Sequence, residues 1–134
     1  KRSPDYLGWR YGQNPLHAFS IIRLERQGEL LGFCIYKLDE QRRMQIFDLY
    51  ADQDPEVQNN LLSSAIRVAQ EKGARFLDMT LLAGNSWISL LQRYMFRKRE
   101  SDHQVFVFAP KSSSMLSDVT NPFNWYLTNG DRDT

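Results

Sequence analysis

Apolar positions along the chain change their spacing several times, and each change marks an expected element. Residues 18–27 and 29–38 are rich in β-branched and aromatic residues and predict two strands joined by a turn at Gln27-Gly28. Residues 43–51, RMQIFDLYA, predict a third strand that suits a central position in a sheet. The first half of the chain therefore predicts a mostly antiparallel sheet.

The spacing then becomes helical over residues 55–72. Asp54 is a good N-cap, Pro55 suits the first helical position, and Gly73 suits the end. One apolar face is expected from residues three and four apart, namely Val57, Leu61, Leu62, Ala65, Val68 and Ala69.

Two strands and a helix are expected after that helix. Residues 75–83 predict a strand, a helix starts at Asn85 or Ser86 and runs to Phe96, and residues 103–110 predict a final strand. A strand, a helix and a strand in succession form a βαβ crossover with parallel strands. The predicted class is α/β (α+β), a mixed and mostly antiparallel sheet with one crossover and flanking helices. Residues 1–110 form the predicted domain, and 111–134 form an aromatic and acidic tail.

The composition argues against several classes of function. The net charge of +1 gives no electrostatic reason to bind DNA, and no metal-ligand cluster or apolar run long enough to span a membrane is visible. The single cysteine, Cys34, lies in an apolar run, which favours a buried structural thiol over a nucleophile. A cytoplasmic protein is the expectation. Because the chain does not begin with Met, we also expect a segment of a longer protein.

The order of elements resembles the GCN5-related N-acetyltransferase (GNAT) fold over about residues 9–110. Residues 61–79, LLSSAIRVAQEKGARFLDM, are similar to the long family helix and its lysine-glycine stop. A second match is Asn85, which resembles the asparagine that starts a family helix ending in Gly-Phe. The segments GWRYGQNP (8–15) and WYLTNGDRDT (125–134) resemble Fem-type and related enzymes of cell-envelope synthesis. The resemblance implies that the first strand and helix of the family are absent or truncated here, which supports the expectation of a segment.

The resemblance implies acetyl-CoA or another acyl-CoA as cofactor. The family's pyrophosphate loop reads Gln/Arg-x-x-Gly-x-Gly/Ala, and Gln53 would take its first position. Glu56 and Gln58 stand where the glycines belong, and Pro55 removes one N–H donor. An ordinary pyrophosphate grip is therefore disfavoured. Cofactor contacts that the resemblance implies are the backbone of Leu49, Tyr50 and Ala51, with Gln53, Gln58, Asn59 and Asn85.

The catalytic positions depart from the family too. Leu91 stands where a tyrosine acid is common, and Met95 replaces the glycine, which leaves Tyr94 as a nearby substitute. Asp48 is a carboxylate in an otherwise apolar strand, and such a group needs a partner or a function. It could be a catalytic base or a structural residue, and the sequence leaves both open.

The aromatic and charged ends suggest a substrate site. Carboxylates and aromatic faces bind amines and sugar rings, and the candidates are Trp9, Arg10, Tyr11, Trp125 and Asp131. Trp125 could instead anchor the tail to the core. The expected function is acetyl or aminoacyl transfer to an amine of a small molecule or a cell-envelope precursor. The alternative is a non-catalytic GNAT-like binding or dimerisation module of a tandem-domain protein. Separately, an exposed edge strand at 97–110 could pair with a second copy.

Overall fold

The computed structural model describes residues 3–13, 18–99, 121, 125, 127, 128 and 131. They fall into two compact units, Lys1–Thr80 with Thr128–Thr134, and Leu81–Leu127. The predicted strand at 103–110, and most of the predicted tail at 111–134, lie outside the described residues.

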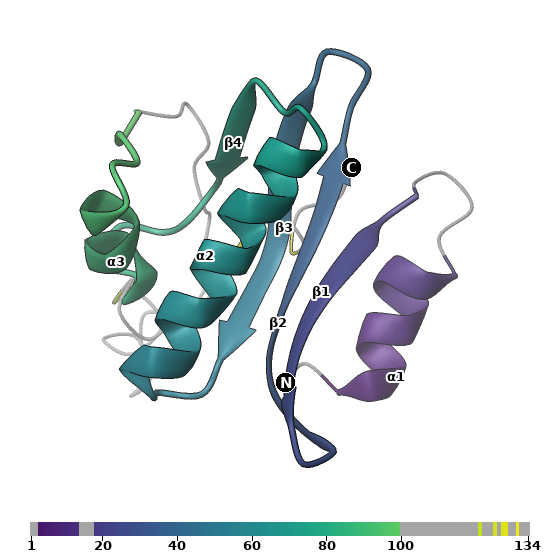
Figure 1. The fold of residues 1–134 in the computed structure, drawn as a ribbon. Coiled ribbons are helices and arrows are strands. Elements are labelled where there is room, and N and C mark those ends of the chain that lie inside the picture. Colours follow the sequence, from purple (N-terminus) through teal and green to yellow (C-terminus); the bar gives the residue numbers. More distant parts are fainter. Residues whose placement is uncertain are drawn as a thin grey trace, which may run out of the picture. The chain divides into compact units, whose positions relative to one another are not determined.

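The first unit is a four-stranded sheet with helices on both faces. Strand β1 pairs antiparallel with β2, β2 pairs antiparallel with β3, and β3 pairs parallel with β4 (Figure 1). The mixed, mostly antiparallel sheet with one βαβ crossover is therefore confirmed. Its elements are α1 (Pro4–Leu7), the π-helical turn η1 (Gly8–Gly12), β1 (Ser20–Arg26), β2 (Glu29–Leu38), β3 (Arg43–Ala51), α2 (Pro55–Glu71) and β4 (Phe76–Met79).

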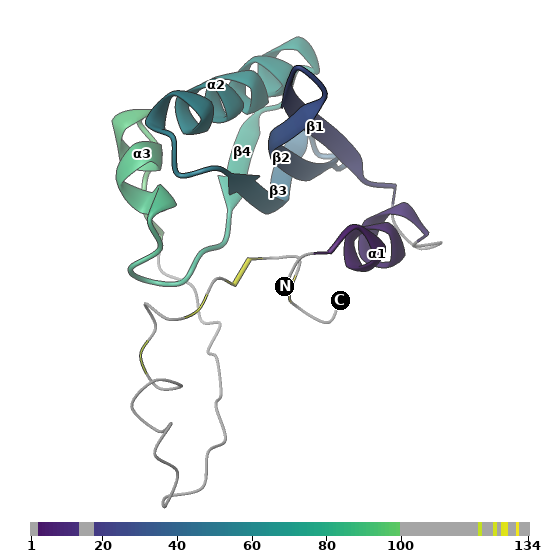
Figure 2. The same cartoon turned by 90° about the horizontal axis from the view of Figure 1, so that it is seen from below.

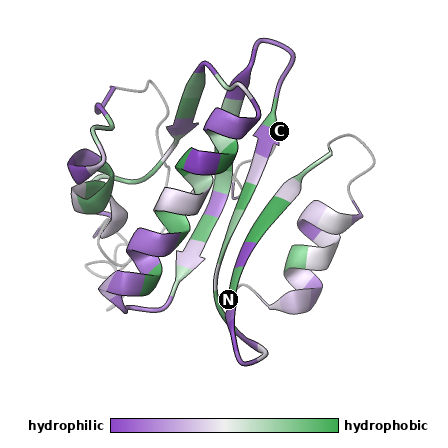
Figure 3. Cartoon of the chain, in the orientation of Figure 1, coloured by the Kyte–Doolittle hydropathy of each residue, from purple (hydrophilic) through white to green (hydrophobic). Residues whose placement is uncertain are grey.

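Helix α2 forms the crossover and covers one face of the sheet (Figure 2). Hydrophilic and hydrophobic residues both occur along its length (Figure 3), as in an amphipathic helix with one apolar face. Five of the six predicted face residues are buried, and the sixth, Val68, packs partly buried against the cluster of Tyr36, Met44 and Ala69. Gly73 has a φ of 65°, the left-handed conformation expected just past a helix end.

The opposite face of the sheet is covered by the chain's first helical residues. Tyr11 packs there with Phe33 and Ile35, and Phe47 joins this cluster from β3. The rings of Phe19 and Phe47 meet edge to face, with centroids 5.0 Å apart. Two separate apolar clusters thus fix the central strands from both sides.

Two elements at the end of the pattern are shorter than predicted. The strand expected at 75–83 stops at Met79, where its pairing with β3 ends, and the chain turns at Gly84, where φ is 88°. Helix α3 (Trp87–Arg93), in the second unit, ends before the predicted Phe96. Met95 has a φ of 68°, so the backbone cannot continue as a right-handed helix.

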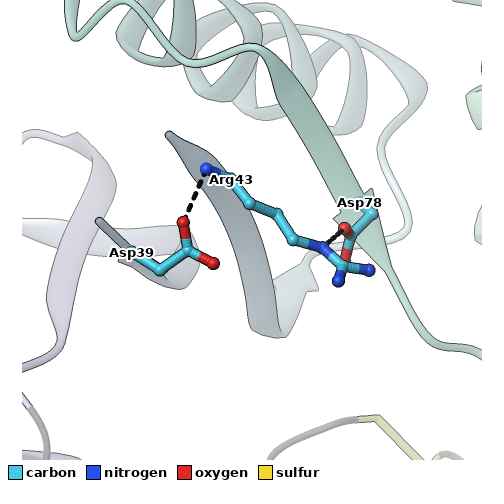
Figure 4. A network of polar contacts seen from close by, with 3 residues as sticks. All are labelled: Asp39, Arg43 and Asp78. Atoms are coloured by element: carbon cyan, nitrogen blue, oxygen red, sulfur yellow. Dashed lines mark hydrogen bonds and ion pairs between the residues drawn. The ribbon is translucent and has the colours of Figure 1, made fainter. Parts of the chain in front are cut away.

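An ion pair joins the first residue of β3 to the parallel strand β4. The Arg43 guanidinium pairs with the Asp78 carboxylate on β4, and the Arg43 backbone N–H donates to Asp39 Oδ1 at 2.8 Å (Figure 4). The hydrogen bond to Asp78 raises the pKa of Arg43. The start of β3 is therefore linked to β4 by a side-chain pair as well as by the parallel ladder.

Candidate active site

A β-bulge interrupts the pairing of β2 with β3. Ile35 pairs with Asp48 and the next residue, Tyr36, pairs with Ile46, so Phe47 is an extra residue in β3. An extra residue makes two neighbours share a face of the sheet. Phe47 packs against the Tyr11 cluster, and Asp48 also contacts Tyr11, so both side chains lie on the face that η1 covers.

Asp48 is fully buried and hydrogen bonded. The Tyr11 hydroxyl donates to Asp48 Oδ2 at 3.5 Å, and the Leu49 backbone N–H donates to Asp48 Oδ1 at 3.0 Å. A buried carboxylate is tolerated only with such donors. The structure thus brings together two predicted site residues, Asp48 and Tyr11, and the predicted contact of Tyr11 with a substrate stays a prediction.

The C-terminal half of β3 has an edge that no described strand covers. Pairing with β4 ends at Ile46 and Met79. The Asp52 N–H donates to the Leu31 carbonyl at 3.0 Å, so backbone groups of even-numbered residues near this end face β2. Those of Leu49 and Ala51 consequently face away from β2, as the family-based prediction requires. The Leu49 N–H is already bonded to Asp48.

Tyr50 lies beside this edge on the face that η1 covers. Its ring stacks on Phe33 at a centroid distance of 5.7 Å and is 46% exposed. Its hydroxyl donates to Asp52 Oδ1 at 3.4 Å. An exposed aromatic ring with a carboxylate at its tip can bind a cationic or hydroxyl-bearing group.

The α2 N-terminus is closed to a pyrophosphate by its own residues. Pro55 has no N–H. The Glu56 N–H donates to Asp54 Oδ1 at 2.8 Å, and the Gln58 N–H donates to the Asp54 carbonyl at 3.1 Å. Among the described residues, only Val57 keeps an N–H there without a partner. The exposed carboxylates of Asp54 and Glu56 would also repel phosphate. These residues do not fit the phosphates of CoA.

The other predicted contacts near α2 have local roles. The Asn59 side-chain amide donates to the Pro55 carbonyl at 2.6 Å, so this amide is hydrogen bonded within its own helix. Gln53 is exposed in the loop, and Gln58 is half-buried. Their proposed contacts with a cofactor stay predictions.

Cys34 lies opposite Leu49 in the β2–β3 pairing and is fully buried. Burial, with a smaller contribution from the Asp48 charge, raises the pKa of its thiol to about 12. A thiol with this pKa stays protonated and unreactive near neutral pH. The prediction of a buried structural cysteine is confirmed.

Three predicted site residues belong to the second unit. The Asn85 side chain accepts from the Trp87 N–H at 2.9 Å, and so caps the start of α3. Tyr94 is half-buried at the end of α3, and Trp125 is 37% exposed. Their roles toward a substrate or cofactor stay predictions.

The remaining predicted substrate residues lie near the ends of the first unit. Trp9 is 64% exposed and Arg10 is half-buried on η1. Asp131 accepts hydrogen bonds from the backbone and hydroxyl of Thr128, at 2.8 and 3.2 Å. Their contacts with a substrate also stay predictions.

Sequence reasoning missed the bulge, although a signal was present. The buried positions Met44, Ile46 and Leu49 are spaced by two and then three, which indicates one inserted residue in a strand. In the part of the chain that the structure describes, no group of His, Cys, Asp and Glu could hold a metal ion. Each described helix is too short or too polar to span a lipid bilayer.

No protein-family model and no curated protein sequence matches the chain. Solved structures do match. A ribosomal-protein-alanine N-acetyltransferase from Brucella melitensis biovar Abortus 2308 superposes with a TM-score of 0.58 at 18% identity, over 81% of each chain. An aminoglycoside acetyltransferase from an uncultured soil metagenomic sample superposes with a TM-score of 0.55 at 17% identity, over 83% of this chain and 76% of that one. The chain therefore shares the mixed α/β fold of these acetyltransferases, the fold that its resemblance to the GNAT family implies.

Proposed function

We propose that this chain is an N-acyltransferase domain that moves an acetyl or aminoacyl group to an amine. The observation that carries the proposal is the position of Asp48, which the bulge places on the face of the sheet that η1 covers, hydrogen bonded to the backbone N–H of Leu49. A carboxylate next to outward backbone N–H groups provides a base and an oxyanion site together.

The reaction needs two groups from these residues, a base for the amine and a hydrogen-bond donor for the oxyanion. The amine attacks the acyl carbonyl, a C–N bond forms, and the C–S or C–O bond to the leaving group breaks. Asp48 takes the proton that the amine loses, and the leaving thiolate or alkoxide finally gains a proton. A backbone N–H of β3 stabilises the negative oxygen of the tetrahedral intermediate. Because Asp48 holds the Leu49 N–H, movement of this carboxylate toward the amine also releases a donor for that oxygen.

The acyl donor in this proposal is acetyl-CoA, another acyl-CoA or an aminoacyl ester. Its acyl end would lie along the backbone of Leu49, Tyr50 and Ala51. Because the α2 N-terminus does not fit a pyrophosphate, we expect weak binding of the nucleotide part of CoA. An aminoacyl ester, which does not depend on that contact, is the donor that this arrangement favours.

The acceptor in this proposal is an amine on a small molecule or a cell-envelope precursor. Two structural neighbours are named for acetyl transfer, one to alanine of a ribosomal protein and one to aminoglycosides. The likeness of residues 8–15 and 125–134 to enzymes of cell-envelope synthesis supports a precursor as acceptor. Trp9, Tyr50 and Asp52 are the candidates to contact it in the first unit.

The test is acyl transfer from acetyl-CoA and from aminoacyl esters to a panel of amines. We expect Asp48→Asn to lower the rate at least about 100-fold, as loss of a general base does. Asp39→Asn is the matched control, because Asp39 also accepts from a backbone N–H but at the other end of β3. Equal rates for the wild type and Asp48→Asn, or no transfer from any donor, would refute the proposal.

The second candidate is a non-catalytic GNAT-like module of a tandem-domain protein. The closed α2 N-terminus and the occupied Leu49 N–H favour it. Calorimetry with acetyl-CoA up to millimolar concentration, combined with the transfer assay, separates the two. Turnover of any acyl donor contradicts the module, and absence of both binding and turnover supports it.

A further inference from the structure

Two irregular elements meet at the Asp48 carboxylate. Strand β3 has one extra residue, Phe47, opposite β2, and η1 is a π-helical turn in which the Gln13 N–H donates to the Gly8 carbonyl at 3.0 Å. Tyr11 is the buried residue of η1, and its hydroxyl reaches Asp48. Bulges and π-helical turns both occur preferentially beside functional sites. The proposed acyl transfer uses Asp48 but does not yet give Tyr11 a role.

The ring of Tyr11 is fixed by aromatic contacts that lead back to the bulge. It meets the Phe19 ring edge to face, with centroids 5.1 Å apart and an interplanar angle of 81°. Phe19 meets Phe47 in the same manner at 5.0 Å. Since Phe47 directly precedes Asp48, the residue that forms the bulge also supports the tyrosine that contacts the carboxylate. Packing of this kind restricts the direction in which the Tyr11 hydroxyl points.

The two oxygens of the Asp48 carboxylate have different donors. Oδ1 accepts from the Leu49 N–H at 3.0 Å, and Oδ2 accepts from the Tyr11 hydroxyl at 3.5 Å. In the proposed reaction, Oδ1 leaves the Leu49 N–H and turns to the amine. Tyr11 belongs to another element, so this turn does not require the loss of its bond to Oδ2. The buried negative charge then keeps a donor while Oδ1 is occupied with the amine.

We propose that Tyr11 is the positioning residue for the base of the acyl transfer, and that its hydroxyl holds Oδ2 of Asp48 while Oδ1 takes the proton of the amine. This inference rests on the proposed function and adds one residue to it. The proton moves from the amine nitrogen to Oδ1, and the O–H bond of Tyr11 stays intact.

Two titratable side chains from neighbouring elements act on Asp48. The Tyr11 hydroxyl, from η1, donates a hydrogen bond that favours the charged carboxylate. Cys34, from β2, stays neutral around neutral pH, because burial and, to a smaller extent, the Asp48 charge raise the pKa of its thiol to about 12. Removal of the Tyr11 hydroxyl should therefore let Asp48 keep its proton to a higher pH.

Steady-state kinetics of acyl transfer by the full chain, over a range of pH, tests the proposal. Tyr11→Phe keeps the ring and removes the hydroxyl. We expect kcat to fall about tenfold, as the loss of one hydrogen bond to a charged group predicts, with the KM for the acyl donor unchanged. The acid limb of the pH profile should move to higher pH, because the base must be ionised to act. Tyr36→Phe, which alters a buried tyrosine of the cluster under α2, is the matched control and should change neither quantity.

A second comparison uses the double variant Tyr11→Phe/Asp48→Asn. It should be no slower than Asp48→Asn alone, because Tyr11 acts through this carboxylate. A further tenfold loss in the double variant would overturn the proposal.

The same assays separate this inference from the proposed function. Absence of transfer from every donor, or an Asp48→Asn variant as fast as the wild type, refutes the acyl transfer and this inference with it. If Asp48→Asn is slow but Tyr11→Phe keeps the kcat and the acid limb of the wild type, only the role of Tyr11 is refuted.

Discussion

Tyr11 and Asp48 are 37 positions apart in the sequence, and a buried hydrogen bond of 3.5 Å joins the hydroxyl of one to Oδ2 of the other. The bond connects the π-helical turn η1 to the bulged strand β3. Because π-helical turns are uncommon and tend to occur at functional sites, its presence at this residue pair supports the location of the site.

We expect Tyr11→Phe to lower the free energy of unfolding by about 1 kcal/mol, since it leaves Asp48 Oδ2 without this donor. Urea denaturation measures the change. Tyr36→Phe is the control, because Tyr36 is also buried but belongs to the cluster under α2. An equal loss in both variants would mean that the Tyr11 hydroxyl does not support Asp48.

Gly32→Ala should destabilise the protein by about 2 kcal/mol through overpacking. A Cβ at Gly32 would lie 2.8 Å from the Tyr50 carbonyl oxygen and 3.2 Å from the Cα of Ala51, so β3 would have to shift. Thermal denaturation tests this. Gly8→Ala is the control, because a Cβ there meets nothing within 4 Å. Equal melting temperatures for the two variants would contradict the close approach.

Met95→Gly should raise the free energy of unfolding by about 0.5–1 kcal/mol. Met95 holds a φ of 68°, which only glycine adopts without strain, and its side chain is 82% exposed, so little packing is lost. Met95→Ala removes the same side chain and keeps the strain, and should change nothing. If both variants had a higher free energy of unfolding, the gain would come from removing the side chain and not from relieving backbone strain.

The raised pKa of the buried Cys34 thiol predicts a loss of folding stability at high pH. Its thiol pKa is about 12 in the folded chain and 9.0 in the reference state, so the folded state holds its proton longer. This stabilisation is fully present below pH 9.0 and is lost as pH rises toward 12, by at most about 1.4 kcal/mol per pH unit.

Denaturation of the wild type and of Cys34→Ala at several pH values isolates this contribution from that of tyrosines and lysines. The difference between the two should shrink as pH rises above 9.0. Alkylation by iodoacetamide at about pH 8 should be slow until the chain unfolds. Rapid alkylation of the folded protein would contradict the burial of this thiol.

The ion pair of Arg43 and Asp78 should contribute little. A double-mutant cycle with Arg43→Gln and Asp78→Asn should give a coupling below about 1 kcal/mol, because both side chains are well solvated. Added salt should reduce it further. A coupling several times larger, unaffected by salt, would show that the pair clamps the parallel strands.

The sequence predicted the elements whose signals are local. Asp54, Pro55 and Gly73 delimit α2 within one residue of the expected helix, and Gln27-Gly28 forms the expected turn with φ values of 52° and 84°. The contact of Tyr11 with Asp48 was not predictable in this way, because it depends on packing between distant segments.

The closed α2 N-terminus, in contrast, could be read from the sequence. Asp54 and Pro55 determine it by local chemistry alone, and the structure shows the expected cap. The departures from the family's pyrophosphate loop at Asp54 and Pro55 were therefore visible in the sequence. The contact of Tyr11 with Asp48 became visible only in the folded chain.

The extra residue in β3 means that the position of Asp48 depends on a count of residues as well as on its identity. If Phe47 were paired as a regular residue of the ladder, strict alternation would turn Asp48 toward α2, where Leu61 and Leu62 are fully buried and no charge is tolerated. The same sequence in a regular ladder would therefore hold the carboxylate on the opposite side of the sheet with no change in its chemistry. The pairing of this strand with β2, as well as the residue type at position 48, decides on which side of the sheet the carboxylate lies.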